Sequence, residues 1–256
     1  MRQMPKTGAL FGYDVIGSSS VDDDLLEEVR GNATDFVLEA LEHVGVEERS
    51  RANYSSTGDG ALAVYPESEL PALIDAAYFL QGKLYLHNRA HRPAIRLRLA
   101  VHTAPVRITE EDNFQRPTIE LARLLDAAEF KRVVRRMPDQ NPVTVALVVS
   151  DQAYRVAVRS RHTQRLLPHD FGKVEVINKE FTEDCWIWIP GLDAERVREL
   201  SLPEPSAQPL EQPASAPHGQ PAPGGIVIQG GLEGNNFLGA NHGKITATYQ
   251  QPGGNP

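Results

Sequence analysis

One short run of the chain, residues 56–66, combines a turn that carries a single acid with an apolar segment of strand length. Gly58 and Gly60 flank Asp59, and two glycines permit a tight turn with positive φ that lets a ligand approach backbone and carboxylate closely. We therefore predict a β-hairpin with Asp59 at its tip, well placed to hold a metal ion. Asp-Gly is also the commonest hairpin turn in proteins without a site, so the turn alone does not establish a metal ligand.

A second acid lies inside the first apolar run of the chain. Residues 9–16 have the length and composition of a strand, and Asp14 lies near its end. Burying a lone carboxylate costs several kcal/mol, roughly, unless it is paired or coordinates a cation. Asp14 therefore indicates either a ligand or a cap for the following helix, for which Ser18 to Ser20 are the alternative caps.

Hydrophobic periodicity predicts the remaining elements. Helices are expected at 22–43, 69–90 and 116–135, and further strands at 95–101, 143–149, 173–177 and 184–189. Strand 95–101 alternates strictly, which predicts a half-buried strand whose Arg96 and Arg98 face either solvent or an anion. The order of the elements indicates an α+β fold in which a mixed sheet is covered by helices on one side.

In such a sheet the first strand and the hairpin can be neighbours, and Asp14 and Asp59 then converge. Two carboxylates that share a site repel each other, so that one of them stays protonated unless a cation is bound. A divalent metal resolves this conflict. Mg²⁺ held by one or two carboxylates together with substrate phosphates is a common arrangement in phosphoryl chemistry.

Composition narrows the class of protein. The 256 residues carry a net charge of −8 and one cysteine, Cys185. The charge argues against nucleic acid as a partner, and one cysteine provides neither a disulfide framework nor a cysteine-based zinc site within one chain. No stretch approaches the 18 apolar residues of a membrane span. We therefore expect a cytoplasmic protein that does not enter a membrane.

Four motifs between Thr7 and Gly191 together resemble the class III nucleotidyl cyclases, the catalytic domains of adenylate and guanylate cyclases. They are Asp14-Val-Ile-Gly17 at the end of the first strand, Gly58-Asp59-Gly60, Arg98-Leu-Ala-Val-His102-Thr-Ala-Pro-Val106, and Asp112-Asn-Phe-Gln-Arg-Pro-Thr-Ile-Glu-Leu-Ala-Arg123-Leu. The two acidic motifs are separated by about the family's usual interval.

The resemblance implies a ferredoxin-like cyclase fold, with a mixed and mostly antiparallel sheet, and a head-to-tail homodimer that binds a nucleoside triphosphate. In the family two divalent metals, Mg²⁺ or Mn²⁺, activate the ribose 3′-hydroxyl and neutralise the triphosphate. The implied roles are metal binding by Asp14 and Asp59, phosphate binding by backbone donors of Ser18 to Ser20 (Ser18 and Ser19 foremost) and by Arg98, base contact by Asp112, and transition-state stabilisation by Arg123.

Three positions depart from the family pattern. Ile119 replaces the transition-state asparagine, Ser55 occupies the substrate-binding position that usually carries a base-reading Lys or Glu, and Ala104 replaces a glycine. Losing one positioning hydrogen bond in such a site costs on the order of 10²-fold in rate. Two functions therefore stay open: a nucleotidyl cyclase, and a catalytically degenerate nucleotide-binding fold that acts as an interaction module.

The C-terminal part differs in composition from the rest of the chain. We expect a cyclase-like domain at 1–191, a Pro-rich linker at 192–223 and a Gly/Asn-rich tail at 224–256. The tail has two β-prone segments around an Asn-rich centre and is similar to short amyloid signalling motifs of bacterial and fungal proteins. It either mediates self-assembly or effector recruitment, or is a disordered tail.

Overall fold

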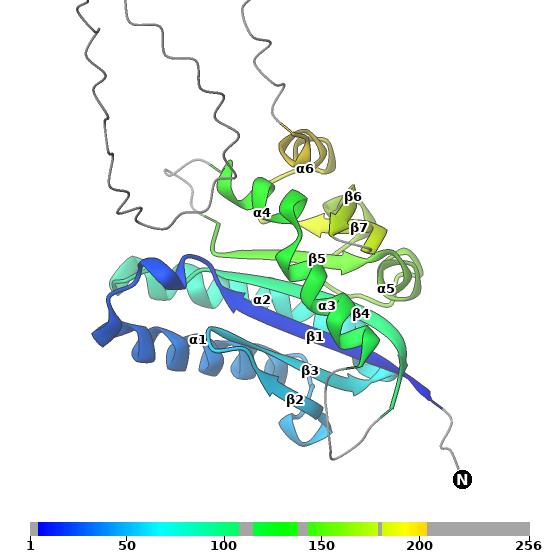
Figure 1. The fold of residues 1–256 in the computed structure, drawn as a ribbon, viewed down its shortest axis with the longest axis horizontal. Helices are drawn as coiled ribbons and strands as arrows, with labels where there is room; N and C mark the ends of the chain where they lie inside the picture. The colour runs from blue at the N-terminus through cyan, green and yellow to red at the C-terminus, as the bar shows by residue number, and fades with distance from the viewer. Residues whose placement is uncertain (1–4, 108–114, 138–142, 179–180, 204–256) are drawn as a thin grey trace, which may run out of the picture. The chain divides into compact units, whose positions relative to one another are not determined.

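The computed structural model describes residues 5–107, 115–137, 143–178 and 181–203. Seven strands form one sheet in the order β2-β3-β1-β4-β5-β7-β6 (Figure 1). The strands are β1 (Lys6–Val15), β2 (Ala52–Ser56), β3 (Gly60–Pro66), β4 (Leu97–Val106), β5 (Val145–Ser150), β6 (Gly172–Asn178) and β7 (Phe181–Trp188). Only β4 and β5 pair in parallel, whereas every other neighbouring pair is antiparallel. The predicted mixed, mostly antiparallel α+β fold is confirmed.

The helices within the described residues fall into long and short elements. The longer ones are α1 (Asp23–His43), α2 (Leu70–Ala90), α3 (Arg116–Asp126), α4 (Ala128–Arg135) and α6 (Ala194–Ser201). The three-residue α5 (Asp151–Ala153) continues into a π-helical segment, Tyr154–Arg159, and short 3₁₀ turns occur at Ser18–Ser20, Glu48–Ser50, Glu67–Glu69 and Pro168–Asp170.

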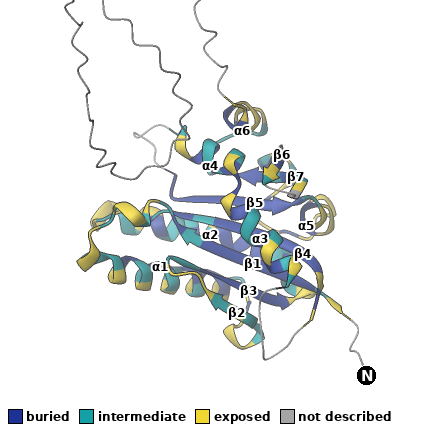
Figure 2. Cartoon of the chain, in the orientation of Figure 1, coloured by how far each residue is buried: buried dark blue, intermediate teal, exposed yellow. Residues whose placement is uncertain are grey.

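Helices cover both faces of the sheet, and the expectation of helices on one side is wrong (Figure 2). Alternate residues of β1 separate the two layers. Phe11 and its neighbours at every second position belong to the core cluster formed with α1 and α2, whereas Leu10 belongs to the cluster formed with α3, α4 and α6. For the same reason β4 is buried on both faces and is not half-buried, since α3 covers the side that carries Ala100 and His102. Strict alternation on β4 predicted a strand but not the second helical layer.

Gly12 explains how α3 can lie so close to β1. A Cβ atom at this position would be 2.6 Å from Leu62 Cδ2 and 3.2 Å from both Leu121 Cδ2 and Leu125 Cδ1. Any larger residue would overpack this contact. The glycine therefore fixes the separation between the first strand and the helix that carries Arg123.

Two predicted boundaries differ from the structure. The single helix expected at 116–135 is interrupted at Ala127, whose ψ of 131° is extended, so that α3 and α4 are separate helices. No glycine or proline marks this break in the sequence. Helix α6 lies in the segment expected as linker from residue 192, and its Val197 packs against Gly172 of β6. Ordered structure thus continues beyond the domain end expected near Gly191.

The compact unit that contains these elements extends through Ser206. The expected tail and most of the expected linker lie outside the described residues. Within the described part of the chain, no helix combines the length and apolarity that crossing a membrane requires.

Candidate functional site

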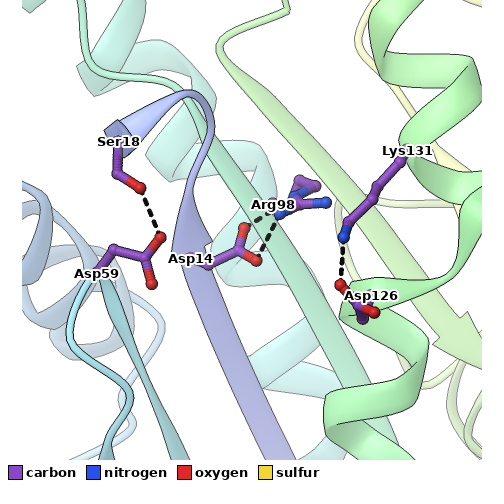
Figure 3. A network of polar contacts seen from close by, with 6 residues as sticks. All are labelled: Asp14, Ser18, Asp59, Arg98, Asp126 and Lys131. Carbon is purple, nitrogen blue, oxygen red and sulfur yellow. Dashed lines mark hydrogen bonds and ion pairs between the residues drawn. The ribbon is translucent and has the colours of Figure 1, made fainter. Parts of the chain in front are cut away.

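Asp14 and Asp59 lie on neighbouring segments of the sheet (Figure 3). Asp14 is the penultimate residue of β1 and pairs in register with Gly60, the first residue of β3. The Val15 N–H donates to the carbonyl of Asp59 at 3.1 Å, which ties the hairpin turn to the end of β1. The prediction that the hairpin pairs beside the first strand is therefore confirmed. The Asp14 side chain points toward Arg98 and the Asp59 side chain toward Ser18 (Figure 3).

Gly60 permits this close approach. A Cβ atom there would lie 1.9 Å from the Tyr13 carbonyl oxygen and 2.8 Å from the Asp14 Cα, both of which are backbone atoms that cannot rotate away. Gly58 has a φ of +93°, the left-handed region that glycine adopts without strain. The two glycines that flank Asp59 thus serve different purposes: one forms the turn, and the other brings the turn against β1.

Arg98 holds the Asp14 carboxylate from β4, the strand on the other side of β1. Its Nε donates to Asp14 Oδ1 at 2.8 Å and its Nη2 donates to Oδ2 at 2.7 Å, a bidentate ion pair. The Asp14 side chain is 17% exposed and that of Arg98 is 15% exposed. Both oxygens of the predicted metal ligand therefore have a cationic partner in this structure.

The electrostatics of Asp14 are set by several neighbours. Burial raises the pKa of Asp14 and is the largest influence, Arg98 opposes it, and the Asp59 carboxylate raises the pKa further. Lys131 acts in the same direction as Arg98 and lowers the pKa. The two acids therefore interact electrostatically, as expected for carboxylates that share a site without a cation.

Ser18 also contributes to the site, but through its side chain. Its hydroxyl donates to Asp59 Oδ2 at 2.7 Å, so that the 3₁₀ turn Ser18–Ser20 orients the hairpin acid. The sequence predicted backbone phosphate donors at a helix N-terminus here. The helix begins only at Asp23, and Ser19 is an exposed residue of the preceding turn. Asp22 lies at the N-cap position without a side-chain capping hydrogen bond.

Lys131 is part of this region and was not identified from the sequence as a site residue. It lies on α4 and forms an ion pair with Asp126, the last residue of α3. Figure 3 shows its side chain directed toward Asp126, beside Arg98. Lys131 was not predicted as a site residue because a single continuous helix was expected at 116–135. Nothing in that helix indicated that the Lys131 side chain would face the strand ends that carry Asp14.

The other predicted site residues lie on different elements. Ser55 is a partly buried residue of β2 opposite Leu62, next to an irregularity in the strand register. Arg123 lies on α3, one turn after Ile119, a residue that is 42% exposed. Asp112 lies outside the described residues. The structure therefore groups Asp14, Asp59, Ser18 and Arg98, while Ser55 and Arg123 project from separate elements.

The donor set at the strand ends fits a hard divalent cation. Two carboxylates and a serine hydroxyl supply oxygen ligands, and Mg²⁺ is commonly bound by one or two carboxylates with substrate phosphates and water completing the shell. Among the described residues no group of three or more His, Cys, Asp or Glu side chains forms a metal cage. The site therefore suits a metal that arrives with a phosphate ligand, provided that Arg98 leaves Asp14.

The arrangement of these elements is the fold of adenylate and guanylate cyclase catalytic domains. The chain is similar to the adenylate/guanylate cyclase/hydrolase from Silicibacter pomeroyi, with a TM-score of 0.51 and 18% identity over 75% of this chain and all of that one. It is also similar to a bacterial light-regulated adenylyl cyclase, with a TM-score of 0.53 and 10% identity over 78% of this chain and all of that one. No protein-family model matches the sequence, and no curated protein is similar to it. At these identities the likeness concerns the fold.

Proposed function

We propose that this protein is a nucleotidyl cyclase-like signalling enzyme that converts a nucleoside triphosphate to a cyclic nucleotide and pyrophosphate. The observation that carries the proposal is that Asp14, at the end of β1 in a cyclase fold, pairs with Gly60, the residue after Asp59, while Arg98 contacts Asp14. Two bound Mg²⁺ or Mn²⁺ ions would activate the ribose 3′-hydroxyl and neutralise the triphosphate. The chain's own residues then position the substrate.

Each of these residues has a role that follows from its place. The Asp14 and Asp59 carboxylates supply the hard oxygen ligands, and the Ser18 hydroxyl keeps the Asp59 carboxylate oriented. The Arg98 guanidinium is a planar fork that matches carboxylate and phosphate equally well, so it can exchange Asp14 for triphosphate oxygens. Arg123 would stabilise charge at the transferring phosphoryl group from the surface of α3.

The proposed enzyme acts as a head-to-tail dimer, as the resemblance to the class III nucleotidyl cyclases implies, in which Arg123 of one subunit completes the site of the other subunit's carboxylates. Mixing inactive Asp59→Asn with inactive Arg123→Ala protein should then restore about a quarter of the activity, since one site is intact in half of the dimers. No recovery despite demonstrated subunit exchange would contradict the shared site.

Product formation tests the proposal. Purified full-length protein is incubated with each of the four nucleoside triphosphates and Mn²⁺ or Mg²⁺, and cyclic nucleotide and pyrophosphate are quantified by mass spectrometry. Wild-type protein and an Asp35→Asn control, which changes an exposed acid on α1, should form product. Asp59→Asn should not. Equal product from Asp59→Asn would refute the assigned role.

A second function is favoured by one observation, the exposed Ile119 at the position where the family has a hydrogen-bonding asparagine. An isoleucine cannot donate to a developing charge, which lowers the expected rate on the order of 10²-fold. In this alternative the domain binds a nucleoside triphosphate without turning it over and acts through its tail in self-assembly or effector recruitment. Nucleotide binding without product in the same assay would support it.

A further inference from the structure

Two cationic side chains lie on the same side of the Asp14 carboxylate, and only one of them belongs to the motifs of the sequence (Figure 3). Arg98 contacts Asp14 directly, and Lys131 approaches from α4. The positive charge of Lys131 acts on Asp14 and lowers the pKa of its carboxyl group. A positive region is thus built beside the carboxylates from two elements far apart in the chain.

The break at Ala127 creates this geometry. If residues 116–135 formed one continuous helix, residue 131 would continue along the α3 axis. The extended backbone of Ala127 instead starts a new helix, and the Lys131 side chain pairs back with Asp126. Ala127 and the neighbouring Phe130 are fully buried, so the turn is fixed by packing. Lys131 is therefore held in place at the rim of the site by the core beneath it.

The partner of Lys131 holds it weakly. The Asp126 side chain is 70% exposed, whereas that of Lys131 is 29% exposed. Ion pairs with an exposed carboxylate contribute little, because water screens them. Arg98, in contrast, is held by two hydrogen bonds to a largely buried acid. Of the two cations, Lys131 is therefore the one that an incoming anion can recruit at the lower cost.

We propose that Lys131 is a phosphate-binding residue that, together with Arg98, receives the polyphosphate group of the substrate. The proposal rests on the proposed nucleotide site and adds to it a ligand from α4, which follows the resembling motifs in the sequence. On binding, Lys131 exchanges Asp126 for phosphate oxygens, and its ammonium group supplies up to three donors. No covalent bond is made or broken in this exchange.

Binding of inorganic triphosphate tests the proposal without reference to turnover. Its affinity for the full chain is measured by calorimetry in the presence of Mg²⁺. Lys131→Met should weaken binding about tenfold, which corresponds to about 1.4 kcal/mol, and Lys131→Arg should retain most of the affinity. Asp126→Asn should bind at least as tightly as wild type, since the competing carboxylate charge is removed.

The matched control is Lys83→Met, which removes another lysine that forms an ion pair, with Glu39, between α1 and α2. It should bind triphosphate as wild type does, and the deficit of Lys131→Met should shrink at high salt because a charge is lost. Wild-type affinity in Lys131→Met, equal losses in Lys83→Met, or no triphosphate binding by wild type would each overturn the proposal. If wild type forms cyclic product but Lys131→Met binds triphosphate as wild type does, only this inference is refuted. If triphosphate binding depends on Lys131 but no cyclic product forms, only the proposed catalysis is refuted.

Discussion

Replacing Arg98 with methionine should destabilise the protein by leaving Asp14 charged, buried and unpaired. Removing one partner of a buried ion pair costs about 3–5 kcal/mol. The side chains of Arg98 and Asp14 retain 15% and 17% exposure, which lets water screen the remaining charge, so we expect about 3 kcal/mol at pH 7. The cost originates in Asp14, since the methionine itself can pack as an apolar residue.

The effect should depend on pH with a defined sign. Burial already raises the pKa of Asp14, and loss of Arg98 removes the main opposing influence, so the pKa rises further. A carboxyl whose pKa is higher in the folded state contributes stability at acid pH that is lost as the pH rises through the folded-state pKa. The deficit of Arg98→Met relative to wild type should therefore be largest near neutral pH and shrink on acidification.

Urea unfolding followed by tryptophan fluorescence measures this, because Trp186 and Trp188 lie in β7 within the folded core. The matched control is Arg196→Met, which removes an arginine that is 55% exposed and paired with Glu199, an acid that is itself 56% exposed. The control should lose less than about 1 kcal/mol. Adding Asp14→Asn to Arg98→Met should recover most of the loss, since no charge is then left unpaired.

Metal should distinguish this ion pair from a purely structural one. In Arg98→Met the Asp14 carboxylate is no longer engaged, so millimolar Mn²⁺ should raise the free energy of unfolding more in the variant than in wild type. The reasoning is refuted if Arg98→Met is as stable as wild type without metal. It is equally refuted if Mn²⁺ stabilises the two proteins to the same extent.

Three further changes have defined outcomes. Gly60→Ala should cost at least about 1–3 kcal/mol in urea unfolding and impair Mn²⁺ binding, because its Cβ would lie 1.9 Å from the Tyr13 carbonyl oxygen and force β3 away from β1. Burial raises the pKa of Glu183 to about 7, so stability should fall as the pH rises from about 4.5 to 7, and Glu183→Gln should flatten that slope in a pH series of urea titrations. The buried Asp75 accepts three backbone N–H bonds from residues 164–166, so Asp75→Asn should lower the free energy of unfolding by about 2–3 kcal/mol, and a change below about 0.5 kcal/mol would contradict that role.

The placement of Asp14 and Asp59 was predictable because it follows from local pattern and turn chemistry. An acid inside an apolar strand and an acid between two glycines are both visible in the sequence, and antiparallel pairing of the hairpin with β1 brings them together. The helices α1 and α2 were predictable for a similar reason, since their apolar positions recur with helical spacing over 21 residues each.

What could not be predicted depends on contacts between distant elements. The break at Ala127 has no glycine or proline, and it exists because both flanking helices pack on the sheet. Lys131 lies near the site only because the helix is broken at Ala127. The ion pair between Arg98 and Asp14 spans 84 residues, and strand alternation left both solvent and an anion open as what the arginine faces. The segment that begins at Ser150 was missed although a serine N-cap followed by Asp151 signals a helix start.

The central claim is that Asp14 and Asp59 jointly hold a divalent cation, and Mn²⁺ binding measures it most directly. Titration of the full chain with Mn²⁺, followed by the electron paramagnetic resonance signal of the free ion, gives the affinity without requiring turnover. We predict that wild type and the Asp35→Asn control bind Mn²⁺ alike and that Asp14→Asn and Asp59→Asn each bind at least about tenfold more weakly, a difference of about 1.4 kcal/mol. Equal Mn²⁺ affinity in all four proteins, or no binding by wild type, would contradict the claim.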